Sequence, residues 1–356
     1  MHDDFIKLYT SLRNEYLLKT EALFTAQKQF WLADFTGHFQ TICNEIVKRQ
    51  NELCLSSISH IDFTMLYSNF LNRRYVVEVW VYGDRAYLDK DQQVINEYDL
   101  SFLFVYFSEL WNKLLSSRKR YVGKVTANEI TTYMIETLPD FFSYFTNTIR
   151  YAIVDSVENS PFINISKNKT FTINSGEYMA KTETIYSESK NKDVNKLSEW
   201  FSEHLNNKYT FGDYSCLDFS GKSFFYTDFR YAQFRRATLN FVNFEGSILI
   251  GSNFRTATME GCSMDNCSIY EADFSGAILK KASFRNASAK AGLPSVREWR
   301  FVGFLPVSFR SADLTNADFT KANLIGADFT GAILDGADFT DAILDDAIFS
   351  DISSIN

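Results

Sequence analysis

SADLTNADFTKANLIGADFT, residues 311–330, decides the fold of the C-terminal half of this chain. A large apolar residue, Leu or Phe, recurs in it at every fifth position, and an alanine stands two positions before each one. Neither the 3.6-residue period of a helix nor the two-residue period of a strand produces this pattern. A five-residue unit cannot bury its own apolar residues, so we predict that neighbouring units stack into one continuous core.

The five-residue period runs from Phe219 to Phe349 with one interruption. Large residues and small residues are both expected to point inward, while the other three positions are mostly polar. Cys262 and Cys267 occupy the position usually held by alanine, which predicts small buried core residues and not a disulfide or a metal site.

This pattern resembles the pentapeptide-repeat family, whose motif is A(D/N)LXX. The resemblance covers most of residues 209–356 and implies a right-handed quadrilateral β-helix with four repeats in each coil. Residues 20 apart would then stack face to face. On that basis we expect Phe234, Phe254 and Phe274 to form one ladder, and Phe319 and Phe339 another.

Residues 290–308 interrupt the repeats. This segment is either a distorted coil with Trp299 and Phe304 inside, or a loop that carries them outward. Pro294 and Pro306 obstruct strand pairing and therefore favour the loop. In a loop, three aromatic side chains become candidates for binding a partner: Trp299, Phe301 and Phe304.

The first repeats are irregular. Lys222 stands where a small inward residue belongs, and aromatic residues occupy positions that should face outward. Exposed aromatic residues are usually covered by another surface. We therefore predict that the N-terminal domain packs on this end of the solenoid through four residues: Phe225, Tyr226, Tyr231 and Phe241.

The N-terminal half lacks the repeat, and we expect an α+β multidomain chain. Residues 1–158 are predicted to form a mainly α-helical domain with a small β-hairpin, and residues 159–208 a polar linker or loose hairpin followed by a connecting helix. Within these segments we predict a helix over 3–50, a hairpin of 74–82 with 85–88, a helix over 100–115, a helix opened by the capping box at Thr126 and broken at Pro139, a further helix over 141–157, and a last one over 194–205.

The net charge of the chain is -8, and its excess of acids lies near the C-terminus. Residues 309–356 contain two bases and nine aspartates. Four of these aspartates follow the family motif. The other five exceed it and are candidates for binding a partner: Asp335, Asp341, Asp345, Asp346 and Asp351. These acids either keep an open strand edge soluble or form a partner surface. The last coils would carry about as much charge per length as duplex DNA, which has about one charge per 1.7 Å.

The sequence contains no motif for catalysis, a cofactor or a metal. Gly221-Lys222-Ser223 lacks the earlier glycine of a phosphate-binding loop, and the four histidines are scattered. Acids follow Met1 where a signal peptide needs bases, and the most apolar stretch is interrupted by polar residues. We expect a cytoplasmic protein, or one exported without a cleaved leader, and in either case no membrane span and no direct nucleic-acid binding.

These features predict a bacterial, non-enzymatic scaffold or adaptor for protein–protein interactions, in which a helical recognition module is carried on a rigid acidic rod. The resemblance supplies an alternative, because some family members protect DNA gyrase by mimicking DNA. A delivered bacterial effector and an unrecognised enzyme in residues 1–208 are further alternatives. The partner is expected to be a protein, including a DNA-binding one such as gyrase, and the oligomeric state is left open, with a dimer as one option.

Overall fold

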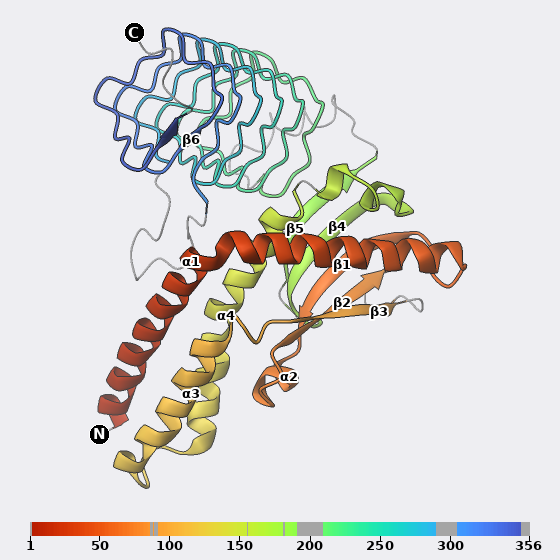
Figure 1. The fold of residues 1–356 in the computed structure, drawn as a ribbon, viewed down its shortest axis with the longest axis vertical. Coiled ribbons are helices and arrows are strands. Elements are labelled where there is room, and N and C mark those ends of the chain that lie inside the picture. The colour runs from red at the N-terminus through yellow and green to blue at the C-terminus, as the bar shows by residue number, and fades with distance from the viewer. Residues whose placement is uncertain are drawn as a thin grey trace. The chain divides into compact units, whose positions relative to one another are not determined.

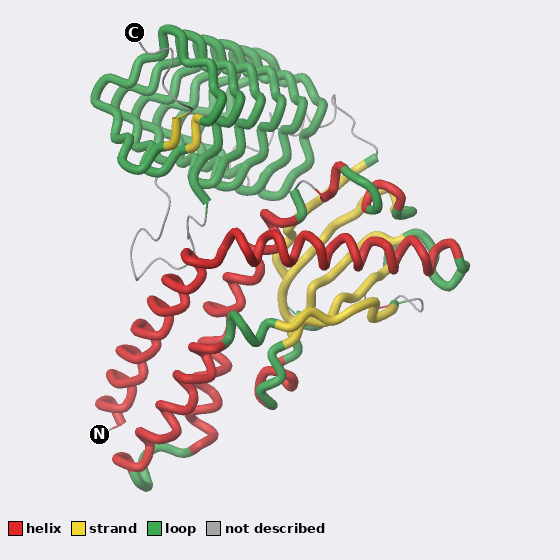
Figure 2. The backbone as a smooth tube through the Cα atoms, in the orientation of Figure 1, coloured by secondary structure: helices red, strands yellow, loops and turns green. Residues whose placement is uncertain are grey.

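The computed structural model describes residues 2–85, 88, 92–154, 156–180, 182–190, 209–289 and 305–349. They belong to two compact units, Met1–Lys190 and Asn191–Asn356 (Figure 1). The first unit combines helices with a sheet, and the second is a stack of coils (Figure 2).

The first unit is organised around α1, a single helix over His2–Asn51. Its first half lies beside α3 (Val105–Ser117) and α4 (Ala127–Ala152), and its second half crosses the sheet (Figure 1). Phe35 and Phe39, which lie one helical turn apart on α1, are fully buried. The Phe35 ring contacts two rings of the sheet and one of α4, and so joins α1 to both. The ring centroids lie 5.4 Å from Phe63, 5.2 Å from Tyr98 and 5.8 Å from Phe145.

The sheet has five strands in the order β3-β2-β1-β4-β5. β1 pairs parallel with β4, and the other pairs are antiparallel. Short helices complete the unit. The bounds are β1 Ile58–Met65, α2 Tyr67–Leu71, β2 Val76–Tyr82, β3 Gln93–Asp99, η2 Arg118–Tyr121, η3 Ser156–Glu158, η4 Phe162–Asn164, β4 Lys167–Glu177 and β5 Thr182–Ser189.

The sheet corrects the predicted hairpin. β2 lies where a strand was expected, but its antiparallel partners are β1 and β3 and not residues 85–88. The central strand β1 was not predicted, because its polar residues are buried and hide the apolar pattern. Asp62, for example, is 6% exposed and accepts a 2.7 Å hydrogen bond from Asn174 of β4.

Two further predictions for this unit are wrong. The helix opened by the confirmed capping box at Thr126 continues through Pro139, which lies on the exposed side while Leu138 and Phe141 hold the flanking turns in the core. The predicted boundary at residue 158 lies inside the first unit, because β4 pairs with β1 and brings its hairpin into the sheet. The predicted helix over 194–205 lies outside the described residues.

The second unit is a β-helix solenoid. Parallel bridges join residues 20 apart, such as Asn253 and Asp273, so each coil contains four five-residue repeats. Among the described residues of this unit, two short strands are long enough to be assigned, β6 Asp328–Phe329 and β7 Ile348–Phe349, and the other described residues are drawn as loop (Figure 2). The large residues point inward, and the register begins at Tyr209, ten residues before the first repeat recognised in the sequence.

The predicted ladders are confirmed. The ring centroids of Phe254 lie 4.9 Å from those of Phe234 and Phe274, and Phe319 lies 5.0 Å from Phe339. These spacings match the separation of paired strands, about 4.8 Å. Cys262 and Cys267 are 1% exposed within this core, as predicted.

Across the interruption, the residues that pair between neighbouring coils are 35 positions apart in the sequence instead of 20. Asp273 bridges Ser308 directly, and the Phe274 ring stacks on Phe309 at 5.1 Å. The coil that contains Phe274 therefore pairs directly with the coil that contains Phe309. The alternative between a loop and a distorted coil concerns residues 290–304, which lie outside the described residues. Trp299, Phe301 and Phe304 themselves lie outside the described residues.

Candidate interaction surfaces

The described repeats turn their corners with a common backbone geometry. The amide of the small residue donates to the carbonyl of the preceding large residue, as from Ala232 to Phe229 at 3.0 Å. The residue two positions after the large one has a positive φ, for example 60° at Tyr231. This combination is the geometry of a type II turn, which favours glycine, asparagine or aspartate at that corner position.

Aspartates that follow the family motif serve these turns. In Asp318, Oδ1 accepts hydrogen bonds from the amide and hydroxyl of Thr320 at 2.9 and 2.6 Å. Arg285 of the neighbouring coil contacts the other oxygen at 2.5 Å. Burial alone would raise the pKa of Asp318, but these hydrogen bonds and the guanidinium outweigh it and hold the pKa below its usual value. Asp313 and Asp328 have equivalent partners.

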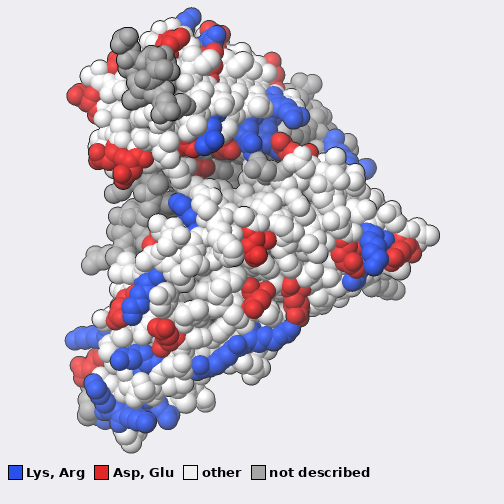
Figure 3. All heavy atoms as spheres, viewed as in Figure 1, with Lys and Arg blue, Asp and Glu red and all other residues white. Residues whose placement is uncertain are grey.

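The acids that exceed the motif are arranged differently. Asp335, Asp341, Asp345 and Asp346 are exposed and lie at three successive corners of the last described coil. Within the described part of the chain, no ion pair involves any of them. Acidic side chains gather on this end of the solenoid in Figure 3. Asp351, the fifth candidate, lies outside the described residues.

Two of these acids also suit their backbone. Asp341 and Asp346 have φ of 58° at the corner position, where a short polar side chain is tolerated. Asp335 and Asp345 stand one position earlier, where a positive φ does not occur, so turn geometry gives no reason for a carboxylate there. We call Asp335, Asp341, Asp345 and Asp346 together the acidic corner. Because turn geometry does not account for Asp335 and Asp345, the acidic corner has more carboxylates than the fold requires.

The outward aromatic residues lie at the first corners of the solenoid. Phe225, Tyr226 and Phe241 are 50%, 79% and 67% exposed, and Tyr231 is half-buried. Three of them lie over glycines of the next coil. A Cβ added to the glycine would come within 2.3 Å of the Tyr226 ring at Gly246, 2.4 Å of Tyr231 at Gly251 and 2.8 Å of Phe241 at Gly261. Packing on glycine gives these rings a role within the solenoid that the sequence did not indicate.

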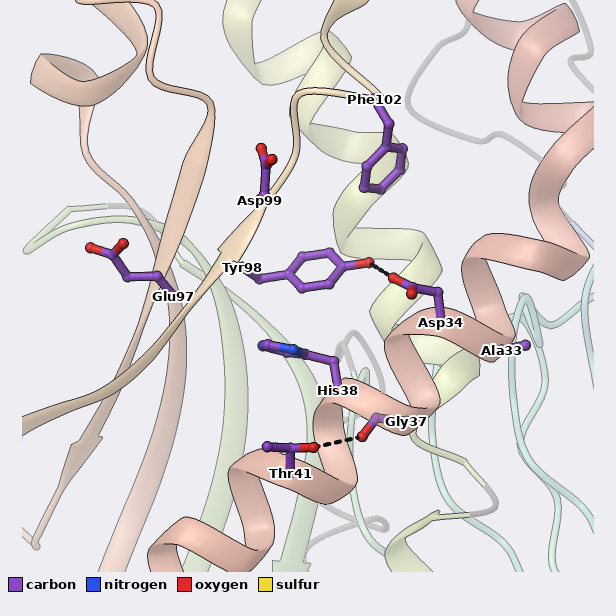
Figure 4. Close-up of a pocket in the computed structure, with 9 residues that line it drawn as sticks. All are labelled: Ala33, Asp34, Gly37, His38, Thr41, Glu97, Tyr98, Asp99 and Phe102. Atoms are coloured by element: carbon purple, nitrogen blue, oxygen red, sulfur yellow. Dashed lines mark hydrogen bonds between the residues drawn. The ribbon is translucent and has the colours of Figure 1, made fainter.

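A separate hollow of about 720 Å³ lies in the first unit between α1 and the edge strand β3 (Figure 4). Tyr98 points across it and donates a 2.7 Å hydrogen bond to Asp34. The His38 ring lies tilted against the Tyr98 ring, with their centroids 4.7 Å apart, and the buried Nε2 of His38 has no hydrogen-bond partner among the described residues. Burial lowers the pKa of His38, partly opposed by Asp34, so the imidazole is neutral at pH 7. Sequence patterns did not predict this hollow, because the residues on its two sides, on α1 and β3, are far apart in the chain.

The described residues contain no group of three or more His, Cys, Asp or Glu residues placed to hold a metal ion. None of the helices described is long and apolar enough to cross a membrane.

The family model described as pentapeptide repeats matches this chain in eight copies, over residues 227–266, 239–276, 267–290 and 309–351. Residues 227–351 are a pentapeptide-repeat region. No curated protein matches the chain.

Several solved pentapeptide-repeat structures resemble this chain. HetL of the cyanobacterium Nostoc, involved in regulating heterocyst differentiation, is 18% identical; the match covers 47% of this chain and all of that one, with a TM-score of 0.14. A protein of the Arabidopsis thaliana thylakoid lumen is 26% identical over 42% of this chain and 84% of its own, with a TM-score of 0.17. QnrB1, a plasmid-mediated fluoroquinolone resistance protein, is 17% identical over 39% and 70%, with a TM-score of 0.17.

Proposed function

We propose that this pentapeptide-repeat protein is a non-enzymatic scaffold for protein–protein interactions. In this proposal a rigid, right-handed, four-sided β-helix presents an acidic corner to a protein partner, and the N-terminal unit supplies a second recognition surface. The stacked aromatic core supports the rigidity, because each coil is fixed by its neighbours at about the strand spacing.

One observation carries the proposal: turn geometry gives no reason for two carboxylates of the last coil, those of Asp335 and Asp345. Asp318 forms turn hydrogen bonds and an ion pair, whereas Asp335 and Asp345 are exposed without ion pairs among the described residues. Unneutralised carboxylates on one rigid end attract a basic protein surface and exclude acidic ones. The partner surface is therefore expected to be rich in Lys and Arg.

A DNA mimic that modulates or protects a type II topoisomerase such as DNA gyrase is the second candidate. Its support is the concentration of nine aspartates in residues 309–356, at a density near that of duplex DNA, about one charge per 1.7 Å. The interruption at 290–308, with Trp299, Phe301 and Phe304, would add contacts outside the coils. A delivered effector and an enzyme in residues 1–208 have no comparable support.

The remaining expectations stay part of the proposal. They are a bacterial, cytoplasmic protein, a dimer as one oligomeric option, a connecting segment ahead of residue 209, and contact between the units through Phe225, Tyr226, Tyr231 and Phe241. The packing of three of these rings on glycines weakens the argument for that contact, because their position no longer requires a second surface.

The test is a pull-down from bacterial cytoplasm with a quadruple variant, Asp335→Asn, Asp341→Asn, Asp345→Asn and Asp346→Asn. We expect the variant to keep its melting temperature and lose the partner, with wild-type binding weakened by salt. A matched control removes four exposed acids from the first unit: Asp3→Asn, Glu52→Gln, Glu109→Gln and Glu136→Gln. Equal capture by wild type and the quadruple variant would contradict the proposal.

A supercoiling assay with purified gyrase separates the two candidates. A DNA mimic should inhibit or protect the enzyme at micromolar concentration and lose this effect in the quadruple variant. A scaffold for another protein should have no effect on gyrase, while the pull-down still depends on the acids.

A further inference from the structure

A run of basic residues stands out against the negative charge of the chain. Between Glu109 and Glu129 there is no acid, and five basic residues occur within twelve positions. All five are exposed. We call this set the basic tip: Lys113, Arg118, Lys119, Arg120 and Lys124.

The chain reverses direction at the basic tip. α3 ends at Ser117, η2 follows, Gly123 takes a φ of 73°, and the capping box at Thr126 opens α4. The tip therefore forms the end of the bundle of α1, α3 and α4, where Lys and Arg side chains gather in Figure 3. Tyr121 packs edge-on against Phe5 of α1 at 5.2 Å, and Val125 is buried. These contacts hold the turn on the bundle.

The charges of the basic tip are not neutralised within the described part of the protein. No ion pair there involves any of its five residues. Glu129, the next acid in the sequence, is held by the amide and hydroxyl of Thr126 at 2.6 and 2.9 Å. Arg118 follows α3 as its C-cap residue, where a cation stabilises the helix, but this accounts for only one of the five.

An apolar side chain protrudes among these cations. Val122 is 83% exposed, and it stands between Arg120 and Lys124 at the turn. Basic residues attract anionic headgroups, and a neighbouring apolar residue enters the boundary between headgroups and acyl chains. The same valine would only meet phosphates and water on a nucleic acid, where base readout and stacking need polar or aromatic side chains.

We propose that the basic tip docks the protein on an anionic membrane surface, without a spanning segment. The five cations and Val122 lie within twelve residues at one end of the helical bundle, so a single bilayer surface can meet them together. This proposal does not depend on the acidic corner, so it can fail while the scaffold proposal holds.

The test uses the full chain and vesicles of phosphatidylcholine with or without roughly one third phosphatidylserine. We expect sedimentation with the anionic vesicles, little with the neutral ones, and loss of binding as salt rises to about 0.5 M. Because each basic residue near such a surface strengthens binding about fivefold, Arg118→Gln, Lys119→Gln and Arg120→Gln together should weaken partitioning about 100-fold. Val122→Gln should weaken it further without changing net charge.

Two controls match these variants. Lys222→Gln, Arg236→Gln and Lys321→Gln remove the same charge from exposed positions of the solenoid, and Leu53→Gln removes an apolar side chain that is 92% exposed. Both should bind vesicles as wild type does, and unfolding curves of all variants should agree. Equal losses in the triple variant and its control would overturn the proposal, as would binding to duplex DNA or RNA without binding to anionic vesicles.

Discussion

At the scale of single residues, contacts between neighbouring coils explain why large aromatic residues occupy corner positions of the solenoid. Tyr226, Tyr231 and Phe241 hold positive φ, an uncommon conformation for large side chains. Each lies over a glycine of the following coil, where a Cβ would collide with the ring. Each aromatic ring and its glycine thus form a packed pair across two coils.

Substitution of Gly251 tests this pairing of ring and glycine. Gly251→Ala should cost the left-handed backbone strain, about 1 kcal/mol, plus about another 1 kcal/mol for displacing the Tyr231 ring. Gly276 has a similar φ of 65°, but its nearest neighbour is a methyl carbon of Thr256 at 3.5 Å, so Gly276→Ala should cost the strain alone. Urea unfolding of both variants, alone and with Tyr231→Ala, gives a double-mutant cycle. The excess cost at Gly251 should vanish when Tyr231 is absent; an unchanged excess would refute the ring contact.

Phe254 tests the core ladder. Its side chain is fully buried between two stacked rings, so Phe254→Ala should destabilise the solenoid by about 3–5 kcal/mol. Phe254→Asp buries an unpaired carboxylate and should prevent folding of these coils. Hydrogen exchange of peptides from residues 229–289 reports the loss locally. Phe225→Ala, at a half-exposed site of the same unit, is the control and should change stability by less than about 1 kcal/mol.

At the scale of elements, the turns of the solenoid are held by carboxylates. The pKa of Asp318 is lowered in the folded state, so its contribution to stability is present above its unfolded pKa, about 3.9, and is lost as the pH falls through the lower folded value. The same sign applies to Asp313 and Asp328. Acid should therefore weaken the coils through their turns.

Asp318→Asn isolates this effect. At pH 7 the variant should be less stable than wild type by about 1 kcal/mol, because the ionised acceptor of two hydrogen bonds is replaced by a neutral one. The difference should shrink below about pH 4 and disappear when Asp318 is protonated. Melting curves across this range provide the measurement, and Asp335→Asn, at an exposed carboxylate outside the turn bonds, should show no such trend. A constant difference at all pH values would contradict the assignment.

At the scale of the whole molecule, each compact unit has its own core. Phe35 joins α1, α4 and the sheet within the first unit, and the ladder through Phe274 and Phe309 continues across the interruption in the second. Independent cores predict independent folding.

Residues 1–190 and 191–356, expressed separately, should each unfold cooperatively at a temperature within a few degrees of the matching transition in the full chain. If the four outward aromatic residues contact the first unit, the isolated solenoid should bind a hydrophobic dye and aggregate. If their glycine contacts are sufficient, the fragment should remain monodisperse. Calorimetry and light scattering distinguish the two outcomes.

The sequence by itself determined the solenoid, its inward residues and its ladders, because a five-residue period repeats one local environment and each repeat contacts only its neighbours. It also located α1 and the capping box at Thr126, which depend on side chains a few residues apart. Only the tertiary structure decided the rest. β1 was hidden by buried polar residues such as Asp62, which are satisfied by β4 more than a hundred residues later. The direct pairing of Asp273 with Ser308, the hollow between Asp34 and Tyr98, and the rings over glycines likewise depend on contacts between distant segments, which no local pattern encodes.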